Sequence, residues 1–194
     1  MSFKSELYRK SIHIFSSIIP LFYAFSSKNF TLKILIPLAL IFIMVEIIRF
    51  NINFINRIYI KILRDIIRIQ EKKRFSGATY LLISSVLVIL FYDKSIAVAC
   101  LLFLTLSDSA AALFGKRFGK IKIYKYNKTL EGSLAFLLSS LIIVYLIKSL
   151  NFITGVSGAI TATFVEFTLT NIDDNLSIPI ISGLVMQLVN TFLI

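Results

Sequence analysis

Apolar residues fill seven long stretches of the chain, and short polar or basic segments separate them. These stretches lie at 11–26, 30–50, 77–92, 94–114, 129–148, 152–170 and 176–194. Each is close to the roughly 20 residues that a helix needs to cross about 30 Å of hydrocarbon. The pattern predicts an all-α fold, a polytopic transmembrane helix bundle of about seven spans. We expect residues 1–194 to form a single integral-membrane domain.

The segment between the second and third stretches, from Asn51 to Ser76, has a different pattern. Its isoleucines and leucines recur at helical spacing among arginines and lysines. This spacing is typical of a basic amphipathic helix that lies on a membrane surface. We expect such a helix on the cytoplasmic side, between spans two and three.

Composition supports a membrane protein and limits its partners. The chain of 194 residues is 57% hydrophobic, and its mean hydropathy is +0.86. A soluble domain of this size needs more polar surface. The net charge of +11 would suit nucleic acid, but basic loops of membrane proteins set orientation and contact anionic lipid or phosphate. We therefore expect membrane lipids, and no nucleic acid, as partners.

The distribution of basic residues predicts the orientation. If the N-terminus is cytoplasmic, all 21 lysines and arginines lie on the inside except Lys28, Lys33, Lys94 and Lys148. Basic loops favour the cytoplasmic side, so the opposite orientation is disfavoured. We expect a multi-pass protein of the inner, cytoplasmic membrane.

Four acidic residues fall inside predicted spans, where a carboxylate is costly to bury. They are Glu46, Asp108, Glu131 and Glu166. At 1.5 Å per residue, all four lie about 3 to 9 Å from the cytoplasmic helix ends. Carboxylates beside basic loops suit a Mg²⁺-nucleotide site, because oxygen ligands hold the metal and cations neutralise phosphate. Glu46 also has a structural interpretation, since Arg49 follows three residues later and can pair with it.

The region from Ser107 to Ser133 carries the richest chemistry. Asp108, Ala111, Ala112 and Gly115 share one helix face, and its small residues would let another helix or a ligand come close. We expect Gly115 and Gly119 to open a basic turn.

That turn contains Lys116, Arg117 and Lys120. Exposed backbone N–H groups and cations together suit a polyphosphate. After Lys128, Thr129 is a candidate N-cap of the next helix, with Glu131 in its first turn. The Walker A spacing is absent from the sequence. The residues alone predict a phosphate-handling membrane enzyme.

Five short motifs are spread over nearly the whole chain. They are Arg9-Lys10-Ser11-Ile12-His13, the pair Glu46 and Arg49, the set Asp108, Ala111, Gly115 and Gly119, the set Lys128, Glu131 and Gly132, and the set Asp174, Asn175 and Pro179. With them the chain resembles the CTP-dependent lipid kinases, a family that includes dolichol kinase, phytol kinase and the CTP-using diacylglycerol kinase. Ser107 stands where the family more often has glycine.

The resemblance implies a CTP-dependent kinase that phosphorylates a long-chain lipid alcohol and releases CDP, with Mg²⁺ as cofactor and the active site on the cytoplasmic face. It implies catalytic and metal-binding roles for Asp108, Glu131 and Asp174. Nucleotide or phosphate binding would fall to Gly115, Lys116, Arg117, Gly119, Lys120, Lys128, Asn175 and His13. Glu46, Arg49 and Glu166 would support these residues. A single histidine near an interface can also be a satisfied polar residue without a role in the site.

Two other functions stay open at this point. Phosphatidate cytidylyltransferases share a similar K-T-x-E-G motif, but their signature continues into a basic and histidine-containing C-terminal stretch, whereas this chain has no lysine or histidine after Lys148. A membrane transporter would spread polar residues through the full thickness, whereas the outer half here carries almost no charge. The alcohol itself, polyprenol, phytol-like or diacylglycerol, is not specified.

Overall fold

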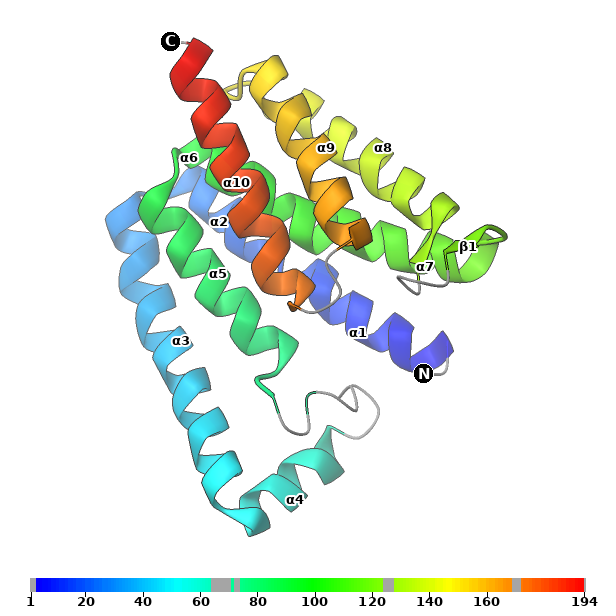
Figure 1. The fold of residues 1–194 in the computed structure, drawn as a ribbon. Coiled ribbons are helices and arrows are strands. Elements are labelled where there is room, and N and C mark those ends of the chain that lie inside the picture. Colours follow the sequence, from blue (N-terminus) through cyan, green and yellow to red (C-terminus); the bar gives the residue numbers. More distant parts are fainter. Residues whose placement is uncertain (1–2, 64–70, 72–73, 124–127, 169–171, 194) are drawn as a thin grey trace.

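The structure is a computed structural model that describes residues 3–63, 71, 74–123, 128–168 and 172–193. These residues form a helical bundle with one short hairpin (Figure 1). The helices are α1 (Phe3–Phe15), α2 (Ile18–Phe25), α3 (Lys28–Asn51), α4 (Asn53–Ile62), α5 (Gly77–Phe91), α6 (Lys94–Leu102), the π-helical turn η2 (Phe103–Ser107), α7 (Asp108–Phe118), α8 (Leu130–Leu146), α9 (Phe152–Thr168) and α10 (Asp174–Leu193). The hairpin strands are β1 (Lys122–Ile123) and β2 (Lys128–Thr129).

The helical run from α6 through η2 to α7 forms the centre of the bundle. The most apolar part of this run is 78% buried, against 28% for α3 and 33% for α10. Helices α8 and α9 pack on one side of it, and α10 packs on α5, α6 and α9. Phe103, Leu104, Phe136 and Ile178 are fully enclosed and form part of one apolar core.

The structure confirms an all-α bundle with several helices that can cross a membrane. Three helical runs are long and apolar enough to do so, 28–51, 94–118 and 174–193, and α5, α8 and α9 are shorter apolar helices. The first predicted span, 11–26, differs, because α1 and α2 are separate helices that break at Ser16 and Ser17. The number of seven spans therefore stays a prediction.

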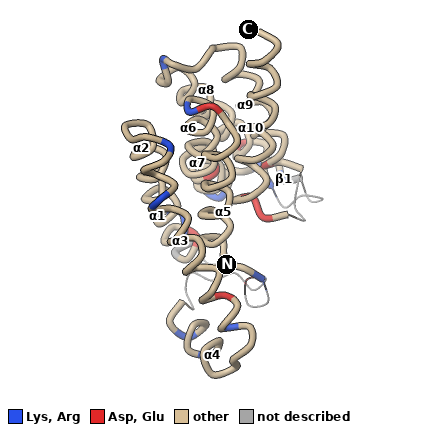
Figure 2. Tube along the Cα trace, turned by 90° about the vertical axis from the view of Figure 1, so that its left-hand side faces the viewer, with Lys and Arg blue, Asp and Glu red and all other residues tan. Residues whose placement is uncertain are grey.

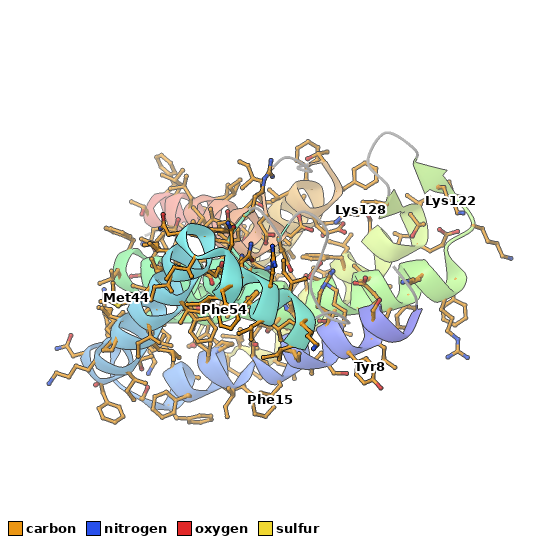
Figure 3. The ribbon with its side chains drawn as sticks, turned by 90° about the horizontal axis from the view of Figure 1, so that it is seen from below. Tyr8, Phe15, Met44, Phe54, Lys122 and Lys128 are labelled. Atoms are coloured by element: carbon orange, nitrogen blue, oxygen red, sulfur yellow. The ribbon has the colours of Figure 1, made fainter. Side chains whose placement is uncertain are left out.

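The basic amphipathic segment begins with a helix, as expected, and its place on the cytoplasmic membrane surface stays a prediction. Helix α4 covers the start of that segment and lies below the other helices, apart from the main bundle (Figure 2). It buries none of its residues completely. Phe54 and Ile62 are exposed on it, and Figure 3 shows Phe54 from below. Residues 64–70 and 72–73 of the predicted helix lie outside the described residues.

The hairpin between α7 and α8 is a feature that the sequence did not predict. Its strands are antiparallel, with Lys122 opposite Thr129 and Ile123 opposite Lys128. Thr129 is the N-cap of α8, as expected, because its hydroxyl accepts a hydrogen bond from the Gly132 N–H at 3.2 Å. The hairpin therefore joins the end of α7 directly to the start of α8.

Small residues allow α7 and α8 to approach closely. A Cβ atom at Gly132 would lie 2.9 Å from the Ala111 carbonyl oxygen and 3.3 Å from the Cα of Gly115. The small face of α7 is thus occupied by another helix. The expected turn at Gly115 is wrong, because α7 continues to Phe118 and only Gly119 lies at its end.

Arg49, near the end of α3, is completely buried and forms the centre of a polar network. Its Nε donates to the Glu46 carboxylate at 2.5 Å. Its Nη2 donates to the backbone carbonyls of Glu71 and Arg74 at 2.9 and 2.7 Å. Its guanidinium lies 4.5 Å from the ring centre of Tyr59 on α4. The network therefore attaches α4 and the chain before α5 to α3.

Glu46 extends this network to the first turn of α5. Its second carboxylate oxygen accepts hydrogen bonds from the Ser76 N–H at 3.0 Å and the Thr79 hydroxyl at 3.2 Å. Ser76 caps α5 through a bond from the Thr79 N–H at 3.4 Å. The structural interpretation of the Glu46–Arg49 pair is therefore satisfied by contacts within the protein.

We predict that Gly132→Val lowers the free energy of unfolding by about 1–3 kcal/mol, the usual cost of overpacking. The added methyl groups would force α7 and α8 apart at the Ala111 carbonyl. Thermal unfolding in detergent measures the effect, and Leu134→Val on the exposed face of α8 serves as the control. Equal stability of the two variants would contradict the close contact.

We predict that Arg49→Met destabilises the protein by about 3–5 kcal/mol, because it leaves the buried Glu46 carboxylate without its cation. The double variant Glu46→Gln, Arg49→Met should be more stable than Arg49→Met alone. Chemical unfolding of the two single variants and the double variant measures this coupling. If the losses of unfolding free energy in the two single variants add up to the loss in the double variant, the pair does not act as a unit.

Candidate active site

A cavity of about 510 Å³ lies between α1, α3, α4, α5 and the first residues of α7 and α10. The polar residues of its lining are Arg9, Lys10, His13, Ser16, Glu46, Tyr59, Glu71, Ser76, Asp108, Asp174 and Asn175. Its apolar residues are Ile12, Ile41, Phe42, Val45, Leu63, Ala78 and Leu81. An amphiphilic ligand matches such a lining.

Lys10 and Asp108 form a buried ion pair at the polar end of this cavity. The Lys10 ammonium donates to the Asp108 carboxylate, although 98 positions separate the two residues. Lys10 is 2% exposed and Asp108 is 6% exposed. The π-helical turn η2 ends immediately before Asp108, and the Asp108 N–H bonds to the Phe103 carbonyl. Such turns widen a helix locally and are frequent at functional sites.

η2 is also tied to α8 by a pair of hydroxyl groups. The Ser140 hydroxyl donates to the Ser107 hydroxyl at 2.9 Å, and both residues are fully buried. Glycine at position 107 would lack this bond. Ser107, the one noted departure from the family pattern, therefore adds a contact that fixes the turn before Asp108.

His13 and Asn175 bring α1 and α10 together at the same cavity. The His13 Nε2 lies 2.5 Å from the Asn175 side-chain oxygen. A Cβ atom at Gly77 would lie 2.7 Å from the Asn175 Nδ2, so the start of α5 touches the other side of this amide. Asn175 therefore lies between His13 of α1 and the first residue of α5.

Lys128, at the end of the hairpin, binds two carboxylates from neighbouring helices. Its ammonium donates to Glu166 of α9 at 2.7 Å and to Asp174 of α10 at 3.2 Å. Burial lowers the pKa of Lys128, but Asp174, Glu166 and Asp108 raise it more, so the net pKa lies above the ordinary value of 10.5. The stabilisation by this group is complete below pH 10.5 and is lost only as the pH rises through the raised pKa. Lys128 is therefore charged at physiological pH.

The carboxylates of this region exceed the cations that pair with them. Asp108, Glu166 and Asp174 share the two ammonium groups of Lys10 and Lys128. Among the described residues, no three His, Cys, Asp or Glu side chains form a ready metal site. Mg²⁺ in nucleotide sites uses one or two carboxylates together with substrate phosphates and water. The excess of carboxylate at Asp108 and Asp174 fits Mg²⁺ that arrives with a nucleotide.

Glu131 lies apart from this group. Its carboxylate accepts hydrogen bonds from the backbone N–H groups of Lys120 at 2.9 Å and Ile121 at 3.1 Å. It is not one of the described residues that line the cavity. Its assignment to the metal stays a prediction, and the contacts in the structure favour a role in holding the hairpin.

The predicted phosphate-binding cations of the turn lie on the surface. Lys116, Arg117 and Lys120 are exposed, and none is among the described residues that line the cavity. Figure 3 shows Lys122 at the outer edge of the molecule and Lys128 closer to the bundle. Gly115 and Gly119 surround Thr129, because Cβ atoms there would lie 2.7 Å from its Oγ1 and 2.6 Å from its Cγ2. A phosphate-binding role for these five residues stays a prediction.

Lys10 and Glu71 are among the cavity-lining residues to which sequence reasoning gave no role. Lys10 appeared only as part of the RKxxH motif, although it lies three positions before His13 and so shares its helix face. Glu71 accepts a hydrogen bond from the Gly77 N–H at 3.3 Å and lines the cavity. It lies in the basic segment, where no pattern distinguishes it from a surface residue.

Comparison with known proteins identifies relatives over most of the chain. No family model matches it, and no solved structure matches it. The Uncharacterized protein MJ1137 of Methanocaldococcus jannaschii is 32% identical over 189 residues, which cover 94% of this chain and 93% of that protein. The CTP-dependent diacylglycerol kinase 1 of Saccharomyces cerevisiae is 26% identical over 96% of this chain and 74% of its own length.

A second diacylglycerol kinase is similar to this chain over most of its length. The CTP-dependent diacylglycerol kinase 1 of Schizosaccharomyces pombe is 29% identical, with 74% of each chain covered. These matches confirm the resemblance that the motifs indicated. The chain belongs to one family with MJ1137 and is a distant homologue of the CTP-dependent diacylglycerol kinases.

Proposed function

We propose that this protein is a CTP-dependent kinase that phosphorylates the hydroxyl group of a membrane lipid alcohol. The observation that carries the proposal is the buried Lys10–Asp108 pair at the polar end of a cavity with an apolar wall. Homology to the diacylglycerol kinases supports CTP as the donor. It also makes diacylglycerol the first alcohol to test, ahead of polyprenols and phytol-like alcohols.

The reaction would transfer the γ-phosphoryl group of CTP. The lipid hydroxyl oxygen forms a bond to the γ-phosphorus, and the bond from that phosphorus to the β–γ bridging oxygen breaks. CDP leaves with the bonding electrons, and the Asp108 carboxylate accepts the hydroxyl proton. Lys10 would stabilise the charge that spreads over the transferred group, which is the main task of a protein in phosphoryl transfer.

Other residues of the site would position the nucleotide. Lys128 would bind the phosphates, and Asn175, already held by His13, would orient a phosphate or the base. Asp174 would hold Mg²⁺, which supplies charge neutralisation when bound. Asp108 is the alternative metal ligand if another group takes the hydroxyl proton. Lys116 and Arg117, on the end of α7, would attract CTP from the cytoplasm. This arrangement assumes the N-terminus inside, as the basic loops predict.

We predict that Lys10→Ala lowers kcat/KM at least about 100-fold, the usual effect of removing one charge-stabilising donor. Turnover of CTP and diacylglycerol in vesicles measures it, beside polyprenol and phytol as alternative alcohols. Lys61→Ala, an exposed lysine of α4, is the control and should keep full activity. Thermal unfolding of both variants verifies folding. Wild-type rates in folded Lys10→Ala would exclude this mechanism.

The labelled position of CTP separates a kinase from a cytidylyltransferase. With γ-labelled CTP, we predict that the label appears in the lipid phosphate. With α-labelled CTP, the label should remain in water-soluble CDP. A lipid that carries the α-label, with release of pyrophosphate, would instead identify a cytidylyltransferase.

A further inference from the structure

The apolar wall of the cavity also belongs to the outer surface of the bundle. Ile12 of α1 and Ile41, Phe42 and Val45 of α3 line the cavity. The same four residues are 49%, 56%, 37% and 43% exposed, respectively. A sealed cavity would have buried lining residues, so the cavity opens between these side chains.

The two helices beside this opening are held by different neighbours. Helix α1 packs on α7 and η2, whereas α3 packs on α5 and α4. In Figure 1, α3 diverges from the bundle toward its α4 end, and α1 lies across the space from it. The opening therefore lies between two helices that pack mainly on different neighbours.

The opening faces hydrocarbon. α3 is the most apolar of the helices that are long enough to span a membrane, with a hydropathy of 2.4 in its best stretch. Its exposed side chains at Leu40, Ile41, Met44 and Val45 are all apolar. Lipid chains, and not water, would cover this surface in a membrane.

We propose that the lipid alcohol enters its site sideways, through an apolar passage between α1 and α3 bounded by Ile12, Ile41, Phe42 and Val45. The hydroxyl would reach Asp108 while the chain stays in the passage and in the membrane. This inference rests on the proposed function. It names the ligand as an uncharged lipid with a hydroxyl at its polar end, since the inner end offers Lys10, His13 and Asp108 behind an apolar entrance.

A fluorescent reporter tests the passage without turnover. The chain contains no tryptophan, so Phe42→Trp places a single indole in the wall with little change of size. Vesicles would contain increasing mole fractions of a diacylglycerol brominated on its acyl chains, without nucleotide. Occupancy of the passage predicts quenching that saturates as the mole fraction rises, and that unlabelled diacylglycerol reverses.

Two controls define the result. Met44→Trp places the indole on α3 outside the cavity lining, where quenching should rise in proportion to the brominated lipid and resist competition. A phosphatidylcholine with the same brominated chains should quench Phe42→Trp without saturation. Proportional quenching of Phe42→Trp by both lipids would overturn the passage.

A blocking variant links the passage to activity. Val45→Trp should lower kcat/KM for long-chain diacylglycerol about 10-fold or more, while Met44→Trp should leave it unchanged. Because the quenching experiment needs no turnover, its failure in an active protein overturns only the passage. Saturable quenching in a protein without CTP-dependent turnover would support the passage and overturn the kinase.

Discussion

The pairing of buried carboxylates with lysines from distant parts of the chain is the constraint on which the structure depends. An unpaired carboxylate in an apolar bundle is costly, and removal of one partner from a buried pair costs about 3–5 kcal/mol. Lys10 meets Asp108 across 98 positions. Lys128 meets Glu166 and Asp174 across 38 and 46 positions. These pairs join α1 to the start of α7, and the hairpin to α9 and α10.

The two charged clusters of the protein differ in what they can do. Glu46 and Arg49 satisfy each other and several backbone groups, so their network fixes the loop and α4. The cluster at Asp108 has more carboxylate than ammonium, because Asp108, Glu166 and Asp174 share Lys10 and Lys128. Both clusters contribute to the cavity lining, Glu46 from the first and Lys10, Asp108 and Asp174 from the second. The excess carboxylate of the second cluster is the charge that a ligand cation can neutralise. Asn175 lies between His13 and Gly77 and lines the same cavity.

The sequence predicted the elements of this fold better than their contacts. Hydrophobic periodicity located the apolar helices, because a span must be long and apolar. It failed at Ser16 and Ser17, where a short break divides the first stretch, and at the hairpin, whose strands are too short for a pattern. The helix of Asp108 runs to Phe118 and not to residue 114. Asp108 therefore lies about 15 Å from the end of its helix, instead of the expected distance of about 9 Å.

The site was only partly predictable, because spacing along the chain shows local contacts and not tertiary ones. Local spacing suggested the Glu46–Arg49 pair and the Thr129 cap, and the structure has both. The Lys10–Asp108 pair is a tertiary contact, and no local pattern encodes it. Spacing also could not decide whether the small face of α7 meets a helix or a ligand, and the structure has α8 there.

The central claim is that carboxylates and lysines from several helices form one site for a Mg²⁺-nucleotide. Calorimetric titration of the purified protein with CTP, with and without Mg²⁺, tests it most directly. We predict one binding site that needs Mg²⁺ and is lost in Asp174→Asn. CTP binding of equal strength without Mg²⁺ and in that variant would contradict it.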